Sequence, residues 1–226
     1  MLSSSLDGTA RLASTAAPDA PATVLQAHTD AITGCTLHPT GQYLVTASTD
    51  ATWALFDIEA GRCLLRQSDA SAAAYTCAGF HPDGLILATG MASVVRVWDV
   101  KSQANLATFE GHTGAVSCLA FSENGYYLAT GSADATVKLW DLRKLKNFHT
   151  LPAPEGATAA VSSVAFDFSG HVLAVAAAGL SLYDTKAWGN LVAFPTPAAA
   201  TAAAFGPMAG FFASASADGA VQLYGA

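Results

Sequence analysis

The 226-residue sequence has few charged residues, few basic residues and no long hydrophobic run. Charged residues make up 12% of the chain, and 10 Lys and Arg stand against 17 Asp and Glu, for a formal net charge of −7. Nucleic-acid binding depends on cations that neutralise phosphates, so RNA is expected as a partner only indirectly or weakly. No stretch approaches the roughly 20 apolar residues of a membrane-spanning helix. We therefore expect no membrane partner.

Close cysteine pairs and enzyme motifs are also absent. The four cysteines, Cys35, Cys63, Cys77 and Cys118, form no C-x-x-C pair, and a zinc site needs clustered ligands. We expect reduced, mostly buried thiols, because a chain of this length builds a core without disulfides. No nucleophile elbow, Walker A loop or H-E-x-x-H motif occurs. The sequence predicts no metal, no cofactor and no enzyme activity in this chain.

An internal repeat is the main positive feature. Aromatic residues close strand-like runs at intervals of 41–43 residues, at Phe56, Trp98, Trp140, Tyr183 and Tyr224. Turn glycines keep the same phase, at Gly41, Gly84, Gly125, Gly170 and Gly210. Asp follows the first four of these aromatic residues. An aromatic–Asp ending at a period of about 40–45 residues is typical of WD-type β-propeller blades.

Each repeat reads as four short strands. In the third repeat we predict strands at residues 116–121, 127–130, 136–140 and 148–151, separated by Asn-Gly and Ala-Asp turns. The alanine runs at 157–160 and 198–204 could suggest helices, but proline and glycine flank them. The fold prediction is an all-β WD-repeat β-propeller.

We expect one propeller domain over residues 1–226, with five repeats and a partial N-terminal blade. The partial blade covers residues 1–27, and the repeats cover about 28–68, 69–110, 111–152, 153–195 and 196–226. Propellers have typically 4–8 blades, and we expect these blades to belong to a seven-bladed ring in a longer protein. The alternative is a closed five-bladed ring in which residues 23–26 supply the last strand.

Four polar side chains of the third repeat have the spacing of the hydrogen-bonded tetrad of WD repeats. They are His112, Thr130, Asp134 and Trp140. A buried indole N–H needs an acceptor, which the threonine hydroxyl can provide. That hydroxyl can donate to one nitrogen of the imidazole, and the aspartate can accept from the other. Each satisfied buried group avoids a penalty of about 1–3 kcal/mol.

The other repeats keep only part of this pattern. The partial sets are His28, Thr46 and Asp50; Thr89 and Trp98; and Ser214 and Asp218. The fourth repeat has Gly179 where the aspartate belongs. We therefore predict that the third repeat is the most rigid and the fourth the least. Hydrogen exchange should be slowest in the third repeat, and faster exchange there than in the fourth would refute the ranking.

Candidate binding residues fall into two groups. Loops near the channel rim are the usual binding surface of a propeller, and here they include Thr29, Asp30, Thr49, Thr113, Gly114 and Ala133. The only basic cluster is Arg143, Lys144 and Lys146, which is either a solvated loop or a contact for an acidic partner or RNA. His38 and His81 occupy the same His-Pro turn of successive repeats, which favours a structural role.

Several segments are more specific than a generic blade. HPTGQYLVTAS, FHPDGLILATG and DLRKLKNF resemble the C-terminal propeller of the pre-mRNA-processing factor 19 family, and the resemblance is strongest over residues 28–151. It implies a seven-bladed propeller preceded by a U-box, which recruits a ubiquitin-conjugating enzyme, and by a coiled coil that forms a tetramer. Neither segment is in this sequence, so any ubiquitin transfer belongs to the full-length family protein.

The resemblance implies a protein-binding scaffold, the substrate receptor of a spliceosome-associated U-box ubiquitin ligase. The expected partners are splicing-complex proteins and ubiquitination substrates, the expected location is the nucleus, and the expected processes are pre-mRNA splicing and DNA repair. A generic WD-repeat adaptor in signalling is the alternative, and segments such as DLRKLKNF argue against it. An enzymatic propeller would need convergent carboxylates or metal ligands at the channel, and none is evident in the sequence.

Overall fold

The computed structural model describes residues 2–14, 20–68, 73–152, 159–194, 198–206 and 210–225. These residues form strands and turns and no helix, so none of them belongs to a helix that could cross a bilayer. The all-β prediction is confirmed, and the alanine-rich segment Ala200–Phe205 is a strand. The expected repeat boundaries at residues 69, 153, 195 and 196 lie outside the described residues.

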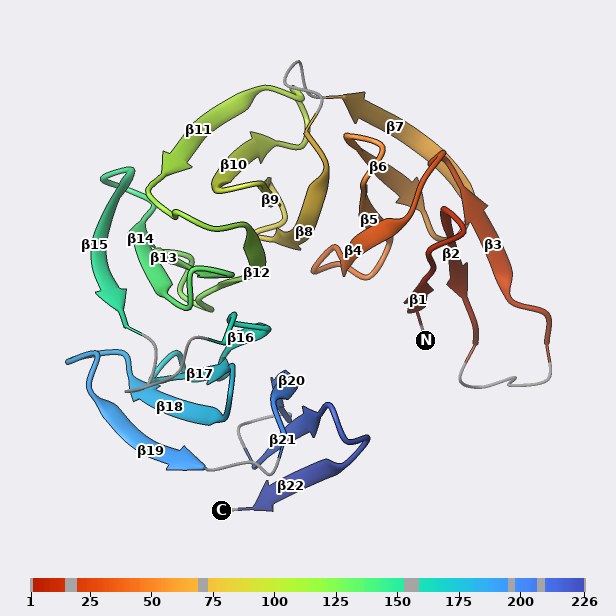
Figure 1. Ribbon diagram of the computed structural model, residues 1–226. Coiled ribbons are helices and arrows are strands. Elements are labelled where there is room, and N and C mark those ends of the chain that lie inside the picture. The colour runs from red at the N-terminus through yellow and green to blue at the C-terminus, as the bar shows by residue number, and fades with distance from the viewer. Residues whose placement is uncertain are drawn as a thin grey trace. The chain divides into compact units, whose positions relative to one another are not determined.

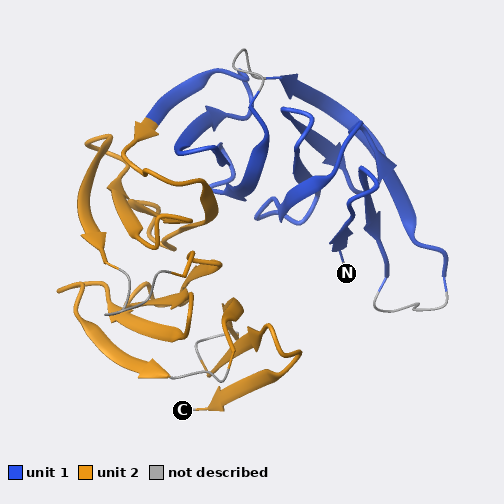
Figure 2. Ribbon diagram, viewed as in Figure 1, with its two compact units in different colours: residues 1–108 blue, residues 109–226 orange. Residues whose placement is uncertain are grey.

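The chain divides into two compact units, residues 1–108 and 109–226 (Figure 2). The N-terminal unit begins with a three-stranded sheet of β1 (Leu2–Ser4), β2 (Thr9–Leu12) and β3 (Thr23–Gln26). The second sheet contains β4 (Ile32–Leu37), β5 (Tyr43–Ser48), β6 (Thr52–Asp57) and β7 (Arg62–Ser68). The third contains β8 (Tyr75–Phe80), β9 (Ile86–Met91), β10 (Val94–Asp99) and β11 (Asn105–Glu110), whose last two residues enter the C-terminal unit.

The C-terminal unit holds three further sheets (Figure 1). They are β12 (Val116–Phe121), β13 (Tyr127–Ser132), β14 (Val137–Asp141) and β15 (Lys146–Leu151); β16 (Ser163–Phe166), β17 (Val172–Ala176), β18 (Leu180–Asp184) and β19 (Asn190–Phe194); and β20 (Ala200–Phe205), β21 (Phe211–Ser216) and β22 (Val221–Gly225). Strands within each sheet follow chain order and pair antiparallel, so each sheet is an up-and-down meander of one repeat.

One expectation about topology is wrong. The closed five-bladed alternative needed residues 23–26 to pair with the last sheet. Instead β3 pairs antiparallel with β2, with Thr9 opposite Gln26 and Leu12 opposite Thr23. The physical reason is local: β2 and β3 are successive strands of one meander, and adjacent antiparallel strands pair with a low cost of loop closure.

The buried core lies between neighbouring sheets. In the N-terminal unit one cluster joins Leu25 of β3 to Leu44 and Phe56 of the second sheet. In the C-terminal unit another joins Leu139 of β14 to Leu173 of β17. Burying a side chain of this size contributes about 1.5–3 kcal/mol. A single sheet cannot bury both of its faces, so each one depends on its neighbour.

Hydroxyl groups on the first strand of a sheet tie it to the next sheet. Thr33 Oγ1 donates to the carbonyl of Tyr75 at 2.7 Å. Ser117 and Ser162 hold the same strand position and donate to the carbonyls of Val161 and Ala200. The sequence analysis missed these bonds, although a hydroxyl recurring at this position of the repeat was a readable signal.

Candidate functional site

The tetrad of the third repeat is assembled by strands β13 and β14 and the turns beside them. Trp140 Nε1 donates to Thr130 Oγ1 at 2.9 Å, and that oxygen lies 2.8 Å from His112 Nε2. His112 Nδ1 lies 2.9 Å from Asp134 Oδ2. Because Thr130 has one proton and accepts from the indole, it donates to Nε2, and the Nδ1–H donates to the carboxylate. All four residues therefore form one continuous chain of hydrogen bonds.

Asp134 also organises the turn around it. Its carboxylate accepts from the backbone N–H of Thr113 at 2.9 Å, and from the N–H and hydroxyl of Thr136 at 2.9 and 2.7 Å. These bonds link the loop before β12 to the turn between β13 and β14. The tetrad is thus a structural lock of the sheet, and all of its polar atoms are committed to partners within the chain.

The first repeat builds a related network with a different outer partner. His28 Nε2 lies 2.7 Å from Thr46 Oγ1, and His28 Nδ1 lies 3.2 Å from Asp50 Oδ2. Arg66 on β7 donates to Asp50 at 2.9 Å and to Thr52 at 3.1 Å. The sequence analysis missed Arg66, because no other repeat has an arginine at this position of its outer strand. An ion pair here replaces the indole hydrogen bond as the extra link between strands.

The remaining partial sets differ in how much they connect. Trp98 Nε1 donates to Thr89 Oγ1 at 2.8 Å, which reproduces the inner half of the tetrad. Ser214 is buried, whereas Asp218 is exposed and accepts from Ser216 and from the backbone N–H of Ala220 within its own turn. Asp218 therefore caps a turn, while Asp134 links separate segments.

Burial and hydrogen bonding shift the titration of these pairs. Burial lowers the pKa of His28 and of His112, and the neighbouring carboxylate offsets only part of that effect. Burial would raise the pKa of Asp50, but hydrogen bonds from Thr52, the Thr29 N–H and His28 outweigh it and bring the pKa to about 2. The pKa of Asp134 is lowered in the same way. Both histidines are therefore neutral and both aspartates ionised at neutral pH.

These shifts predict lower stability in acid. A histidine whose folded pKa is lowered below 6.5 contributes stability that is complete above that pH and is lost as the pH falls below it. The Asp50 contribution is then lost below about pH 4. Urea unfolding midpoints should fall from pH 7.5 to pH 5. His112→Gln should reduce this slope, and His171→Gln, on an exposed turn, should leave it unchanged. Equal slopes in both variants would contradict the assignment.

The candidate rim residues lie on loops, but several already have structural roles. Thr29 and Thr113 are exposed, and their N–H groups donate to Asp50 and Asp134. Asp30 and Ala133 are exposed, whereas Thr49 and Gly114 are partly buried. Thr29, Asp30 and Thr49 belong to the N-terminal unit, and Thr113, Gly114 and Ala133 to the C-terminal unit. Each group forms a separate candidate binding loop.

The basic cluster is exposed and lies beside aromatic side chains. Arg143 pairs with Asp141 at 3.4 Å and lies over the ring of Tyr126, 4.6 Å from its centroid. Lys144 and Lys146 are also exposed. Trp188, in the turn between β18 and β19, reaches the outer strand β15 and lies 5.6 Å from Phe148 between ring centroids. The sequence analysis missed this aromatic contact, because Trp188 belongs to the next repeat.

The expected burial of the cysteines is only partly correct. All four thiols are free, as expected. Cys77 is buried and Cys35 is partly buried, but Cys63 is exposed, because the outer strand β7 has one face in solvent. Burial raises the pKa of Cys118 to about 11, so this thiol is protonated at neutral pH. Among the described residues, no group of three or more His, Cys, Asp or Glu is placed to hold a metal ion.

The family model "WD domain, G-beta repeat" matches residues 20–57, 61–99 and 103–141, which is about half of the chain. The chain belongs to the WD-repeat family. The propeller fold predicted from the repeat is thereby confirmed, and the three matched segments cover the last strand of one sheet and the first three of the next.

Curated relatives narrow the family further. The chain is 42% identical over 210 residues to pre-mRNA-processing factor 19 homolog 2 of Arabidopsis thaliana, and this covers 89% of the chain and 39% of the relative. It is 54% identical over 129 residues to pre-mRNA-processing factor 19 of Oryza sativa subsp. japonica, covering 56% of the chain and 24% of the relative. It is 45% identical over 204 residues to the Bos taurus protein of that name, covering 89% and 40%.

These matches confirm the resemblance to the pre-mRNA-processing factor 19 family. The WD-repeat chain spans at most about 40% of the length of these three relatives. What the whole relatives do is therefore a matter for proposal.

Proposed function

We propose that this WD-repeat chain is a protein-binding scaffold that acts as the substrate and partner receptor of a spliceosome-associated U-box ubiquitin ligase in the nucleus. The observation that carries the proposal is the match to pre-mRNA-processing factor 19 over 89% of the chain in two relatives. The proposed processes are pre-mRNA splicing and DNA repair. The ligase chemistry and the tetramer are proposed for the full-length protein, in which the blades would complete a seven-bladed ring.

The chemistry of the described residues supports binding more than catalysis. The buried His–Asp pairs, which could resemble acid–base partners, are engaged by Thr130 and Trp140 or by Thr46 and Arg66. Exposed polar loops and a basic–aromatic surface remain for partners. Aromatic residues and arginine are enriched at protein interfaces, and lysines at the rim favour acidic partners.

Affinity capture from nuclear extract tests the proposal. The tagged chain should recover spliceosomal proteins, as should the full-length parent. Replacing Thr29, Asp30 and Thr49 together with alanine tests one rim, and replacing Arg143, Lys144 and Lys146 with glutamate tests the basic cluster. Ser102→Ala, in an exposed turn outside both groups, is the control. Consistent recovery of signalling proteins in place of splicing proteins would favour the generic adaptor.

A further inference from the structure

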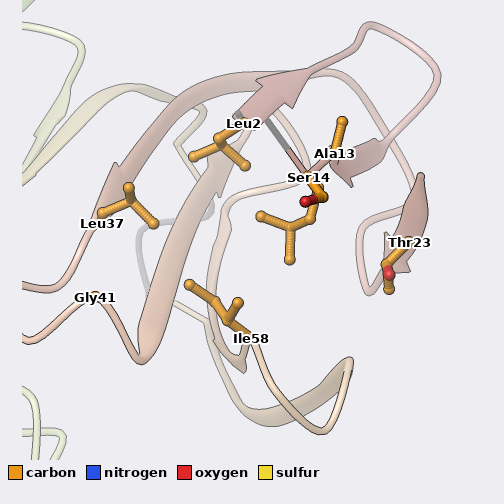
Figure 3. Close-up of a pocket in the computed structure, with 8 residues that line it drawn as sticks. Leu2, Ala13, Ser14, Thr23, Leu37, Gly41 and Ile58 are labelled. Atoms are coloured by element: carbon orange, nitrogen blue, oxygen red, sulfur yellow. The ribbon is translucent and has the colours of Figure 1, made fainter. Parts of the chain in front are cut away.

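A pocket of about 380 Å³ lies within the N-terminal unit, between the first sheet and the second (Figure 3). Its lining residues are Leu2, Leu12, Ala13, Ser14, Thr23, Leu37, Gly41 and Ile58. The side chains of Leu2, Leu37 and Ile58 surround the opening. Leu37 is 48% exposed although it ends a core strand. The pocket is therefore a largely apolar space at a sheet-to-sheet boundary.

The same place at the next boundary is filled by an imidazole. Between the second and third sheets, the ring of His38 lies 5.0 Å from Phe80 and 5.6 Å from Tyr43 between centroids, edge to face with both. His38 Nε2 lies 3.1 Å from the carbonyl oxygen of Gly84, to which its N–H donates. The ring thus closes the boundary with apolar contacts and one hydrogen bond.

A pair of equivalent glycines shows the difference between the two boundaries. Gly41 and Gly84 hold the same turn position, with φ of +72° and +74°. A Cβ added to Gly84 would lie 2.2 Å from His38 Nε2, whereas a Cβ added to Gly41 would meet no atom within 4 Å. Among the described residues, Gly41 has no counterpart of the His38 ring beside it.

The strand that would carry such a ring is also the one that the first sheet lacks in the described chain. In the second sheet β4 precedes β5, pairs antiparallel with it, and leads directly into His38. In the first sheet β1 corresponds to β5, since Ser3 lies opposite Arg11 as Thr46 lies opposite Ala54. The described partner of β1 is β2. Its other edge therefore offers backbone N–H and C=O groups for another strand.

We propose that the edge of β1 and this pocket together receive one protein segment. The segment is an extended strand that pairs antiparallel with β1 and is followed directly by a ring that carries an N–H donor, as imidazole does. The ring enters between Leu2, Leu37 and Ile58 and donates to the carbonyl of Gly41, as His38 does to Gly84. The strand supplies main-chain hydrogen bonds, and the ring supplies selectivity. This inference is independent of the proposed role in splicing.

The test supplies such a segment from the chain's own repeat. Asp7 and Asp50 hold the same turn, so the register of β4 and its turn places a copy of residues 31–43 directly before Met1. The extended chain should melt about 4 °C higher or more, and amide exchange at residues 2–4 should slow at least about tenfold. Alanine in place of the copied histidine should remove about half of the gain in melting temperature. A scrambled extension should give no gain.

A change on the receiving side locates the effect. Ala13→Trp should fill the pocket and abolish the gain from the extension, whereas Leu64→Trp, on the exposed outer strand β7, should leave it intact. The histidine-to-alanine extension keeps the test decisive if Ala13→Trp fails to fold. An equal gain from the intended and scrambled extensions, or unchanged exchange at residues 2–4, would overturn the proposal. So would a dimer of the unextended chain with these amides already protected, because the occupant would then be a second copy.

Discussion

Asp134→Ala is expected to lower the free energy of unfolding by about 3–4 kcal/mol, because it removes one acceptor and leaves several buried donors unpaired. The carboxylate accepts from His112 Nδ1, from the Thr113 N–H and from the N–H and hydroxyl of Thr136. The imidazole would lose its orientation, and with it the bond to Thr130. Urea unfolding at pH 7, followed by tryptophan fluorescence and circular dichroism, measures the loss.

Asp218→Ala is the matched control for this variant. Asp218 is exposed, and it accepts from Ser216 and the Ala220 N–H in its own turn. Its replacement should therefore cost much less than the replacement of Asp134. Asp134→Asn should fall between the two, since the amide keeps one acceptor oxygen but loses the charge. Equal losses for Asp134→Ala and Asp218→Ala would show that the tetrad does not act as a connected unit.

Gly34→Ala is expected to destabilise the N-terminal unit by about 2 kcal/mol or more through overpacking between sheets. A Cβ at Gly34 of β4 would lie 2.9 Å from the backbone nitrogen of Ala78 and 3.1 Å from Cys77 Cα in β8. Backbone atoms cannot rotate away as a side chain can. The substitution would therefore separate the sheets and strain the Thr33 hydroxyl bond to Tyr75.

Gly189→Ala provides the comparison for Gly34→Ala. A Cβ at Gly189 would meet no atom within 4 Å, and neither glycine has a left-handed backbone conformation. The comparison therefore isolates packing from backbone strain. Gly189→Ala should unfold at nearly the same urea concentration as the parent chain. A similar small effect at Gly34 would mean that the second and third sheets are not closely packed in solution.

Features within one repeat could be predicted well from the sequence. The strand expected at residues 116–121 is β12 with the same bounds, and the other three strands of that repeat differ from β13, β14 and β15 by two residues or fewer at either end. The structure brings together His112, Thr130, Asp134 and Trp140 at the expected positions. All four lie within 29 consecutive residues, so spacing along the chain nearly determines their spacing in the sheet.

Features between repeats could not be predicted in this way. Arg66 reaches Asp50 from an outer strand, and Trp188 reaches Phe148 from the next repeat. Neither residue recurs at its position, so no periodic signal marked it. The exposure of Cys63 was also missed, because the sequence alone did not show that one face of β7 lies in solvent.

The sequence by itself determined the repeat, the strands and turns of each blade, and the polar lock of the third repeat, because these depend on residues close together in the chain. The tertiary structure alone decided which side chains meet across sheet boundaries. His38 fills one boundary, whereas a pocket remains beside Gly41 at another. The physical reason is that packing between sheets depends on the shape and orientation of two surfaces at once, and a one-dimensional period specifies neither.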